Sequence, residues 1–168
     1  MPDLIVRLYD LPALAAALDR VKQDGVEIRR ALAPEKSIVA EWVAASFSSA
    51  WADECAVSFA RQPLACFLAL RERELCGFVA YEATCRNFLG PIGVDGNFRG
   101  RGVGEALLLC ALHAMRNEGY AYAIIGGAGP TDFFQKAAGA TLITDSEPGI
   151  YRGMLRERMT PSAHPDEL

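Results

Sequence analysis

The sequence contains few of the residues that bind metal ions in clusters. Of its 168 residues only two are histidines, and its five cysteines form no Cys-x-x-Cys pair. A zinc site usually combines such pairs with closely spaced histidines, so we expect no metal site. An odd number of scattered cysteines indicates reduced thiols in a cytoplasmic protein. These thiols are Cys55, Cys66, Cys76, Cys85 and Cys110.

An excess of positive charge, a secretory signal and a long apolar run are also missing. The formal net charge is -4, whereas a nucleic-acid-binding domain normally displays a basic face. The first residues, Met1 to Ile5, lack the basic-then-apolar layout of a signal peptide. The apolar stretch 106–115 contains His113 and is too short to span a membrane. We therefore expect a single cytoplasmic domain that binds neither nucleic acid nor membrane.

The most informative segment is the glycine-rich stretch 99–104. It follows the strand-like run 89–94 and leads directly into an apolar helical pattern. A chain that passes through glycines into a helix exposes backbone N–H groups at the helix N-terminus, where they can bind an anion such as pyrophosphate. Arg99 and Arg101 add cationic donors beside this loop. The alternative is an Arg/Gly-rich surface turn that binds nothing.

The spacing of the glycines distinguishes between the known types of phosphate-binding loop. No Lys-Ser or Lys-Thr follows them, as a Walker loop would require, and Leu107 stands where a dinucleotide fingerprint has its third glycine. Arg99-x-x-Gly102-x-Gly104 instead resembles the [Gln/Arg]-x-x-Gly-x-[Gly/Ala] loop of the GCN5-related N-acetyltransferase (GNAT) superfamily. In that family the loop holds the pyrophosphate of acetyl-coenzyme A.

The expected order of elements also resembles the GNAT fold. That fold is α/β (α+β), with a central mixed, mostly antiparallel sheet flanked by helices and a splayed central strand pair. The resemblance covers a core at 26–155, preceded by a strand–helix extension at 1–24 and followed by a disordered tail at 157–168. Periodicity and turn residues predict strands at 4–9, 26–32, 65–70, 77–83, 88–94, 120–125, 140–143 and 149–155, and helices at 11–22, 37–47, 51–60, 103–117 and 131–138.

The resemblance implies how acetyl-CoA would bind. The cosubstrate would lie between the strand that ends at Val94 and the strand 120–125, with the pantetheine arm on the backbone of Ile92 and Val94. One N–H there would polarise the thioester carbonyl. Backbone N–H groups of the loop would hold the pyrophosphate. These loop residues are Arg99, Gly100, Arg101, Gly102, Val103 and Gly104.

The catalytic residues are less evident. In many family members a tyrosine on the short helix after the splayed strand, in a pattern like Tyr-x-x-x-Gly-Phe, protonates the leaving thiolate. Phe134 stands in that place here, so we expect the usual acid to be absent. Tyr151 is a candidate acid and Glu82 a candidate base. The alternatives are a half-buried strand tyrosine and a solvent-facing glutamate.

The resemblance implies an acetyl-CoA-dependent N-acetyltransferase that acts by direct attack in a ternary complex. The acceptor would be an amine of a small molecule or peptide, and a homodimer is possible. Alternatives are a non-catalytic acyl-CoA-binding or sensing domain and an acyltransferase with another acyl chain or acceptor. The acceptor site would be formed by residues of the first two core helices, namely Trp42, Phe47, Trp51, Asp53 and Glu54.

Overall fold

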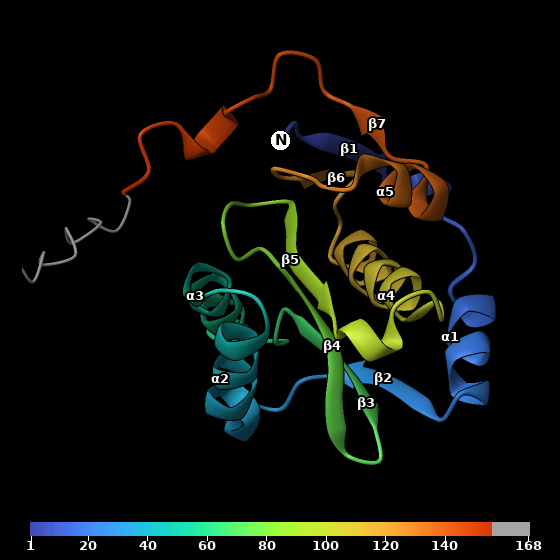
Figure 1. Ribbon diagram of the computed structural model, residues 1–168. Coiled ribbons are helices and arrows are strands. Elements are labelled where there is room, and N and C mark those ends of the chain that lie inside the picture. Colours follow the sequence, from blue (N-terminus) through green and yellow to red (C-terminus); the bar gives the residue numbers. More distant parts are fainter. Residues whose placement is uncertain (156–168) are drawn as a thin grey trace, which may run out of the picture.

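A seven-stranded sheet with helices on both faces forms the framework of the molecule (Figure 1). The computed structural model describes residues 1–155, so the tail expected at 157–168 lies outside the described residues. The strands are β1 (Leu4–Arg7), β2 (Val26–Arg30), β3 (Cys66–Arg71), β4 (Glu74–Tyr81), β5 (Phe88–Val94), β6 (Tyr122–Ile125) and β7 (Thr141–Leu142). The helices are α1 (Leu14–Gln23), α2 (Lys36–Ser46), α3 (Ser49–Ser58), α4 (Val103–Asn117) and α5 (Thr131–Ala138).

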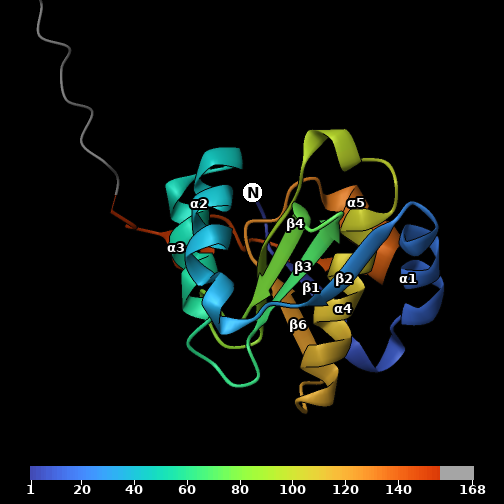
Figure 2. The same cartoon turned by 90° about the horizontal axis from the view of Figure 1, so that it is seen from below.

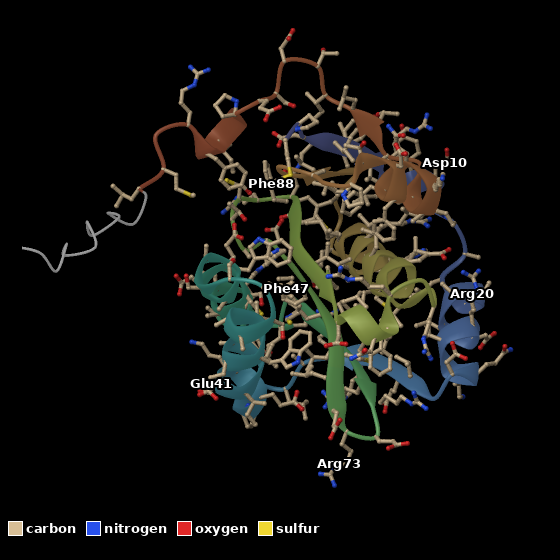
Figure 3. All side chains as sticks on the ribbon, viewed as in Figure 1. Asp10, Arg20, Glu41, Phe47, Arg73 and Phe88 are labelled. Atoms are coloured by element: carbon tan, nitrogen blue, oxygen red, sulfur yellow. The ribbon has the colours of Figure 1, made fainter. Side chains whose placement is uncertain are left out.

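The sheet is mixed and mostly antiparallel, as predicted. Its strand order is β2-β3-β4-β5-β6-β1-β7, and within residues 1–155 only β5 and β6 pair in parallel. The strands expected at 65–70 and 77–83 form an antiparallel hairpin as β3 and β4. Its turn places Glu72 and Arg73 at positive φ, and Figure 3 shows Arg73 pointing outward at the tip. The predicted fold class is therefore correct.

The helices divide between the two faces of the sheet (Figures 1 and 2). α4 and α1 lie on one face, and α2 and α3 lie on the other. α4 is the central helix of the larger core cluster, because most of its side chains are buried on several sides. The smaller cluster lies between α2, α3 and the opposite face of β3 and β4. The two clusters hold β4 and β5 between them, at the middle of the sheet.

The N-terminal strand occupies an interior position in the sheet. β1 pairs antiparallel with β6 through Leu4↔Ile125 and with β7 through Leu4↔Leu142. Leu4 and Val6 are fully buried. The segment expected as an extension therefore contributes a strand that separates β6 from β7.

The prediction of a strand at 149–155 is wrong. The chain forms a short 3-10 helix at Gly149–Tyr151 and continues without regular structure. Gly149 and Gly153 both adopt positive φ, which interrupts an extended run. Ile150 and Leu155 are exposed, so the apparent alternation of apolar residues does not reflect burial against the sheet.

Candidate functional site

The site is built around the point where β5 and β6 separate. The two parallel strands pair only at Phe88↔Ile124 and Leu89↔Ile125. β6 then ends at Ile125, while β5 continues to Val94 beside β4. The expected splayed pair is thus present, and it leaves one edge of β5 open from Gly90 to Val94.

The open edge carries the backbone groups of Ile92 and Val94. Asp95 N–H donates to Cys76 C=O on β4 at 2.9 Å. Because alternate residues of a strand direct their backbone groups to opposite sides, Val94 and Ile92 direct theirs away from β4 and toward the gap. Arg99 Nε donates to Val94 C=O at 3.1 Å, which ties the glycine loop to this edge. The structure therefore brings together the strand residues and the loop that the sequence singled out.

The glycine loop forms the N-terminus of α4. Gly102 is the N-cap with φ of +81°, and Gly100 also has a positive φ of +74°. Both are conformations that a residue with a side chain rarely adopts. A Cβ on Gly104 would lie 3.3 Å from Phe133 Cζ and 3.6 Å from Val94 Cγ2. The glycines thus permit a tight loop whose first helical N–H groups remain available to an anion.

Two arginines near the loop lie over one aromatic ring. The guanidinium carbons of Arg71 and Arg101 are 6.0 Å and 5.9 Å from the centroid of Phe98. Within residues 1–155, neither guanidinium has a carboxylate within 4.0 Å. A cavity of about 450 Å³ opens between them, bounded on its other side by the turn 23–25. Asp24 and Glu72 also line this cavity, so its charge is mixed, with the two guanidinium groups on the side of Phe98.

Tyr151 lies at the opposite end of the gap. Its hydroxyl is 3.2 Å from the position of a Cβ on Gly126, the residue that follows β6, and its Cε2 is 3.6 Å from that of Gly127. Phe88, labelled in Figure 3 at the start of β5, also packs on Gly126. Gly126 must be small because both rings cover it.

Polar groups from two other segments lie near Tyr151. On α3, Glu54 Oε1 accepts a 2.5 Å hydrogen bond from the Thr84 hydroxyl. Burial raises the pKa of the Tyr151 phenol, and the charge of Glu54 raises it further. The nearby Thr84 hydroxyl opposes this pKa shift, whereas weaker charge effects of Asp3 and Cys85 reinforce it. The phenol therefore keeps its proton to higher pH than an ordinary tyrosine.

Glu82 has a different environment. Its carboxylate forms a 3.2 Å ion pair with Arg61, accepts a 3.0 Å hydrogen bond from the Tyr120 hydroxyl and binds the N–H of Asn87. The Glu82 side chain is only 6% exposed. None of its partners lies among the residues around Tyr151. The geometry favours a structural role, so we do not propose Glu82 as the base.

Helix α5 has no tyrosine, and its aromatic residues are packed. Phe134 is 4% exposed and belongs to the core cluster, whereas Phe133 packs against Gly104. Gly139 caps the helix, and counting back through the Tyr-x-x-x-Gly pattern leads to Gln135, which is exposed. The expected placement of Phe134 is therefore wrong by one residue: Gln135 stands in the tyrosine place, Phe134 is a core residue, and neither carries a phenol.

Aromatic side chains cover the α2–α3 side of β5. The Phe47 ring occupies the space where a Cβ on Gly93 would stand, at 2.5 Å, beside β5 (Figure 3). Phe47 also stacks on Trp51 with centroids 5.2 Å apart and packs edge-on with Trp42 at 5.6 Å. Of the expected acceptor residues, these three and Glu54 are partly buried, whereas Asp53 is exposed.

Two polar residues near Tyr151 were missed from the sequence. Thr84 and Asp3 have no local motif, because each acts through partners far along the chain. The only signal for Asp3 in the sequence was a polar residue next to a short apolar strand.

The structure describes no group of His, Cys, Asp and Glu suited to a metal ion. Among helices of residues 1–155, none is long and apolar enough to cross a membrane.

A mixed sheet that opens beside a glycine-capped helix is the arrangement found in the GNAT fold. The chain belongs to the acetyltransferase (GNAT) family, since the sequence model of that family matches residues 14–139. No curated protein matches the sequence.

Solved structures with the same fold are distant in sequence. A GCN5-related glucosamine N-acetyltransferase region of a fungal multi-domain β-N-acetylglucosaminidase has a TM-score of 0.69 and 14% identity, covering 84% of this chain and 19% of that one. A GCN5-related N-acetyltransferase from Sphaerobacter thermophilus has a TM-score of 0.62 and 17% identity, covering 84% and 48%. A GNAT acetyltransferase from Brucella melitensis, in complex with acetyl-CoA, has a TM-score of 0.53 and 17% identity, covering 70% and 86%. The chain thus spans less than half of the first two proteins.

Proposed function

We propose that the protein is an acetyl-CoA-dependent N-acetyltransferase acting on an amine of a small molecule or peptide. The observation that carries this proposal is the open edge of β5 ending at the glycine-capped N-terminus of α4. Acetyl-CoA is an extended molecule with a pyrophosphate in its middle and a thioester at its end. The acetyl-CoA complex of the Brucella relative supports this choice of cosubstrate.

The proposed binding mode uses both ends of the gap. Backbone N–H groups from Arg99 to Gly104 hold the pyrophosphate, as at other helix N-termini. The pantetheine arm follows the edge of β5 from Val94 toward Gly90, a path of about 13 Å at the usual rise per residue. This path ends beside Tyr151, so the thioester reaches the end of the gap that carries the phenol.

The proposed chemistry is attack of a neutral amine on the thioester carbon. An alkyl amine arrives as a cation at neutral pH, and the Glu54 carboxylate attracts it and accepts its proton. The nitrogen then forms the C–N bond, and the C–S bond breaks. The Tyr151 phenol donates a proton to the departing thiolate, and the proton lost by the new amide restores the phenol through water. One proton per turnover is released to solvent.

Two measurements test the proposal. Calorimetric titration should show binding of acetyl-CoA and not of NADH. A thiol-release assay over a library of amines should then show turnover, with cationic amines preferred over anionic ones. A protein that ignores acetyl-CoA, or prefers NADH, would contradict the cofactor assignment.

The absence of a phenol from α5 favours a second candidate, a non-catalytic acyl-CoA-binding domain. Both functions predict acetyl-CoA binding, so binding alone does not distinguish them. Tight binding with no thiol release for any amine would favour the binding domain. Release that depends on the amine would exclude it.

A further inference from the structure

Asp3 is a buried carboxylate that none of the proposed chemical steps uses. The residue is only 8% exposed. Buried carboxylates are costly unless hydrogen bonds stabilise them. Asp3 directly precedes β1, the strand inserted between β6 and β7.

The Asp3 carboxylate contacts the two segments that surround the Tyr151 hydroxyl. Oδ1 accepts a 2.8 Å hydrogen bond from Gly127 N–H, in the loop on which the tyrosine ring rests. Oδ2 lies 3.2 Å from the position of a Cβ on Gly149, the first residue of the 3-10 helix that carries Tyr151. One side chain thus forms a hydrogen bond with the surface beneath the phenol and lies beside the first residue of the segment that presents it.

The Asp3 backbone is fixed independently of its carboxylate. Its N–H donates to Ser146 Oγ at 2.8 Å, and its C=O accepts from Ile143 N–H at 2.9 Å. In addition, Pro2 C=O accepts from Ala128 N–H at 2.8 Å. Replacing the carboxylate should therefore leave the strand end in place, so the side chain can be tested separately from the fold.

Building on the proposed acetyl transfer, we propose that Asp3 is a positioning residue for Tyr151. Its carboxylate holds the loop after β6 and the Gly149–Tyr151 helix together, so that the phenol hydroxyl stays over the point where β5 and β6 separate. The N-terminal strand thereby contributes to the acceptor side of the site, opposite the glycine loop.

The charge of Asp3 gives a readout that a purely structural role would not move. The ionisable groups that act on Tyr151 are Glu54 from α3, Cys85 from the β4–β5 connection, and Asp3. Each raises the pKa of the phenol, so removing the charge of Asp3 lowers that pKa. The alkaline limb of activity, where the phenol loses its proton, then moves to lower pH.

The experiment compares Asp3→Asn and Asp3→Ala with Ser146→Ala, all in the full chain. Asp3→Asn keeps the size and an acceptor oxygen but removes the charge. Ser146→Ala removes a neighbouring hydrogen bond and leaves the carboxylate, so it is the matched control. The Tyr151 ionisation is followed by NMR of ¹³C-labelled tyrosine, with Tyr151→Phe identifying the signal. This readout needs no turnover.

We expect Asp3→Asn to lower the Tyr151 ionisation pH and Ser146→Ala to leave it unchanged. Asp3→Ala should reduce kcat about 10- to 100-fold, as misplacement of a reacting group does. The affinity for acetyl-CoA should stay the same, because the glycine loop lies at the other end of the gap. In a protein that already carries Tyr151→Phe, adding Asp3→Ala should lower kcat little further.

Two results would overturn the role of Asp3. One is an unchanged Tyr151 ionisation in Asp3→Asn. The other is an equal loss of kcat from Asp3→Ala with and without the Tyr151 hydroxyl, which would indicate a structural residue. A wild-type protein that releases no thiol overturns the proposed function instead, and the NMR titration then still decides whether Asp3 acts on the phenol.

Discussion

Replacing Gly102 by alanine tests whether the glycine loop binds the cofactor. Gly102 caps α4 with φ of +81°, and an L-residue in this conformation costs about 1–2 kcal/mol. The added Cβ would also stand 3.3 Å from Arg20 Cδ, but that flexible, exposed side chain can move. We expect the melting temperature to fall by roughly 2–8 °C, as for a chain of this size.

The same substitution should weaken acetyl-CoA binding. Relief of the strained φ rotates the backbone N–H groups that face the pyrophosphate. Loss of one hydrogen bond to a charged group corresponds to about 1.5–3 kcal/mol, which raises Kd roughly 10- to 100-fold. Calorimetric titration with acetyl-CoA measures this change directly.

Gly119→Ala is the matched control. Gly119 follows the other end of α4 with φ of +100°, and nothing lies within 4 Å of a Cβ there. The Gly119→Ala variant should therefore lose about as much stability as Gly102→Ala, while its Kd for acetyl-CoA stays at the wild-type value. The reasoning is refuted if Gly102→Ala binds acetyl-CoA as tightly as wild type, or if both variants lose affinity equally.

Three further outcomes are expected. Tyr151→Phe should lower turnover by about 10²–10⁴-fold at unchanged cofactor affinity; a wild-type rate would mean that solvent protonates the thiolate. Initial-rate lines should intersect, since Cys85 is the most accessible thiol of the described residues yet has no recognisable activating base; a chemically competent acetyl-cysteine would contradict direct transfer. Finally, burial raises the pKa of Tyr81 to about 12, above the ordinary value of 10.0. The stability from this shift is present below pH 10 and lost as pH rises toward 12, so alkaline unfolding curves should show a smaller loss of stability in Tyr81→Phe than in wild type.

Local patterns in the sequence predicted most elements because they depend on neighbouring residues. α5 runs over Thr131–Ala138 as expected, and β5 has the predicted bounds Phe88–Val94. The 149–155 segment was misassigned because Ile150 and Tyr151 look strand-like, whereas the flanking glycines prevent an extended run. Burial, which separates the two cases, is not a local property.

The cofactor end of the site was accessible from the sequence, and the acceptor end was not. The glycine spacing identifies the loop because backbone N–H groups at a helix N-terminus follow from chain order alone. The environment of Tyr151 depends instead on Asp3, which lies far away in the sequence. The environment of Glu82 could not be predicted either, because its ion-pair partner Arg61 is not a neighbour in the sequence.

The interior position of β1 has a consequence for synthesis of the protein. β1 leaves the ribosome before the other strands of the sheet, but its neighbours β6 and β7 begin only at Tyr122 and Thr141. At about 5–20 residues per second, the strand waits roughly 7–28 s for both partners. During that time β2 to β5 and α4 can already pair and pack. A nascent chain can therefore complete the glycine loop early, whereas the acceptor side of the site closes only when the C-terminal quarter has been made.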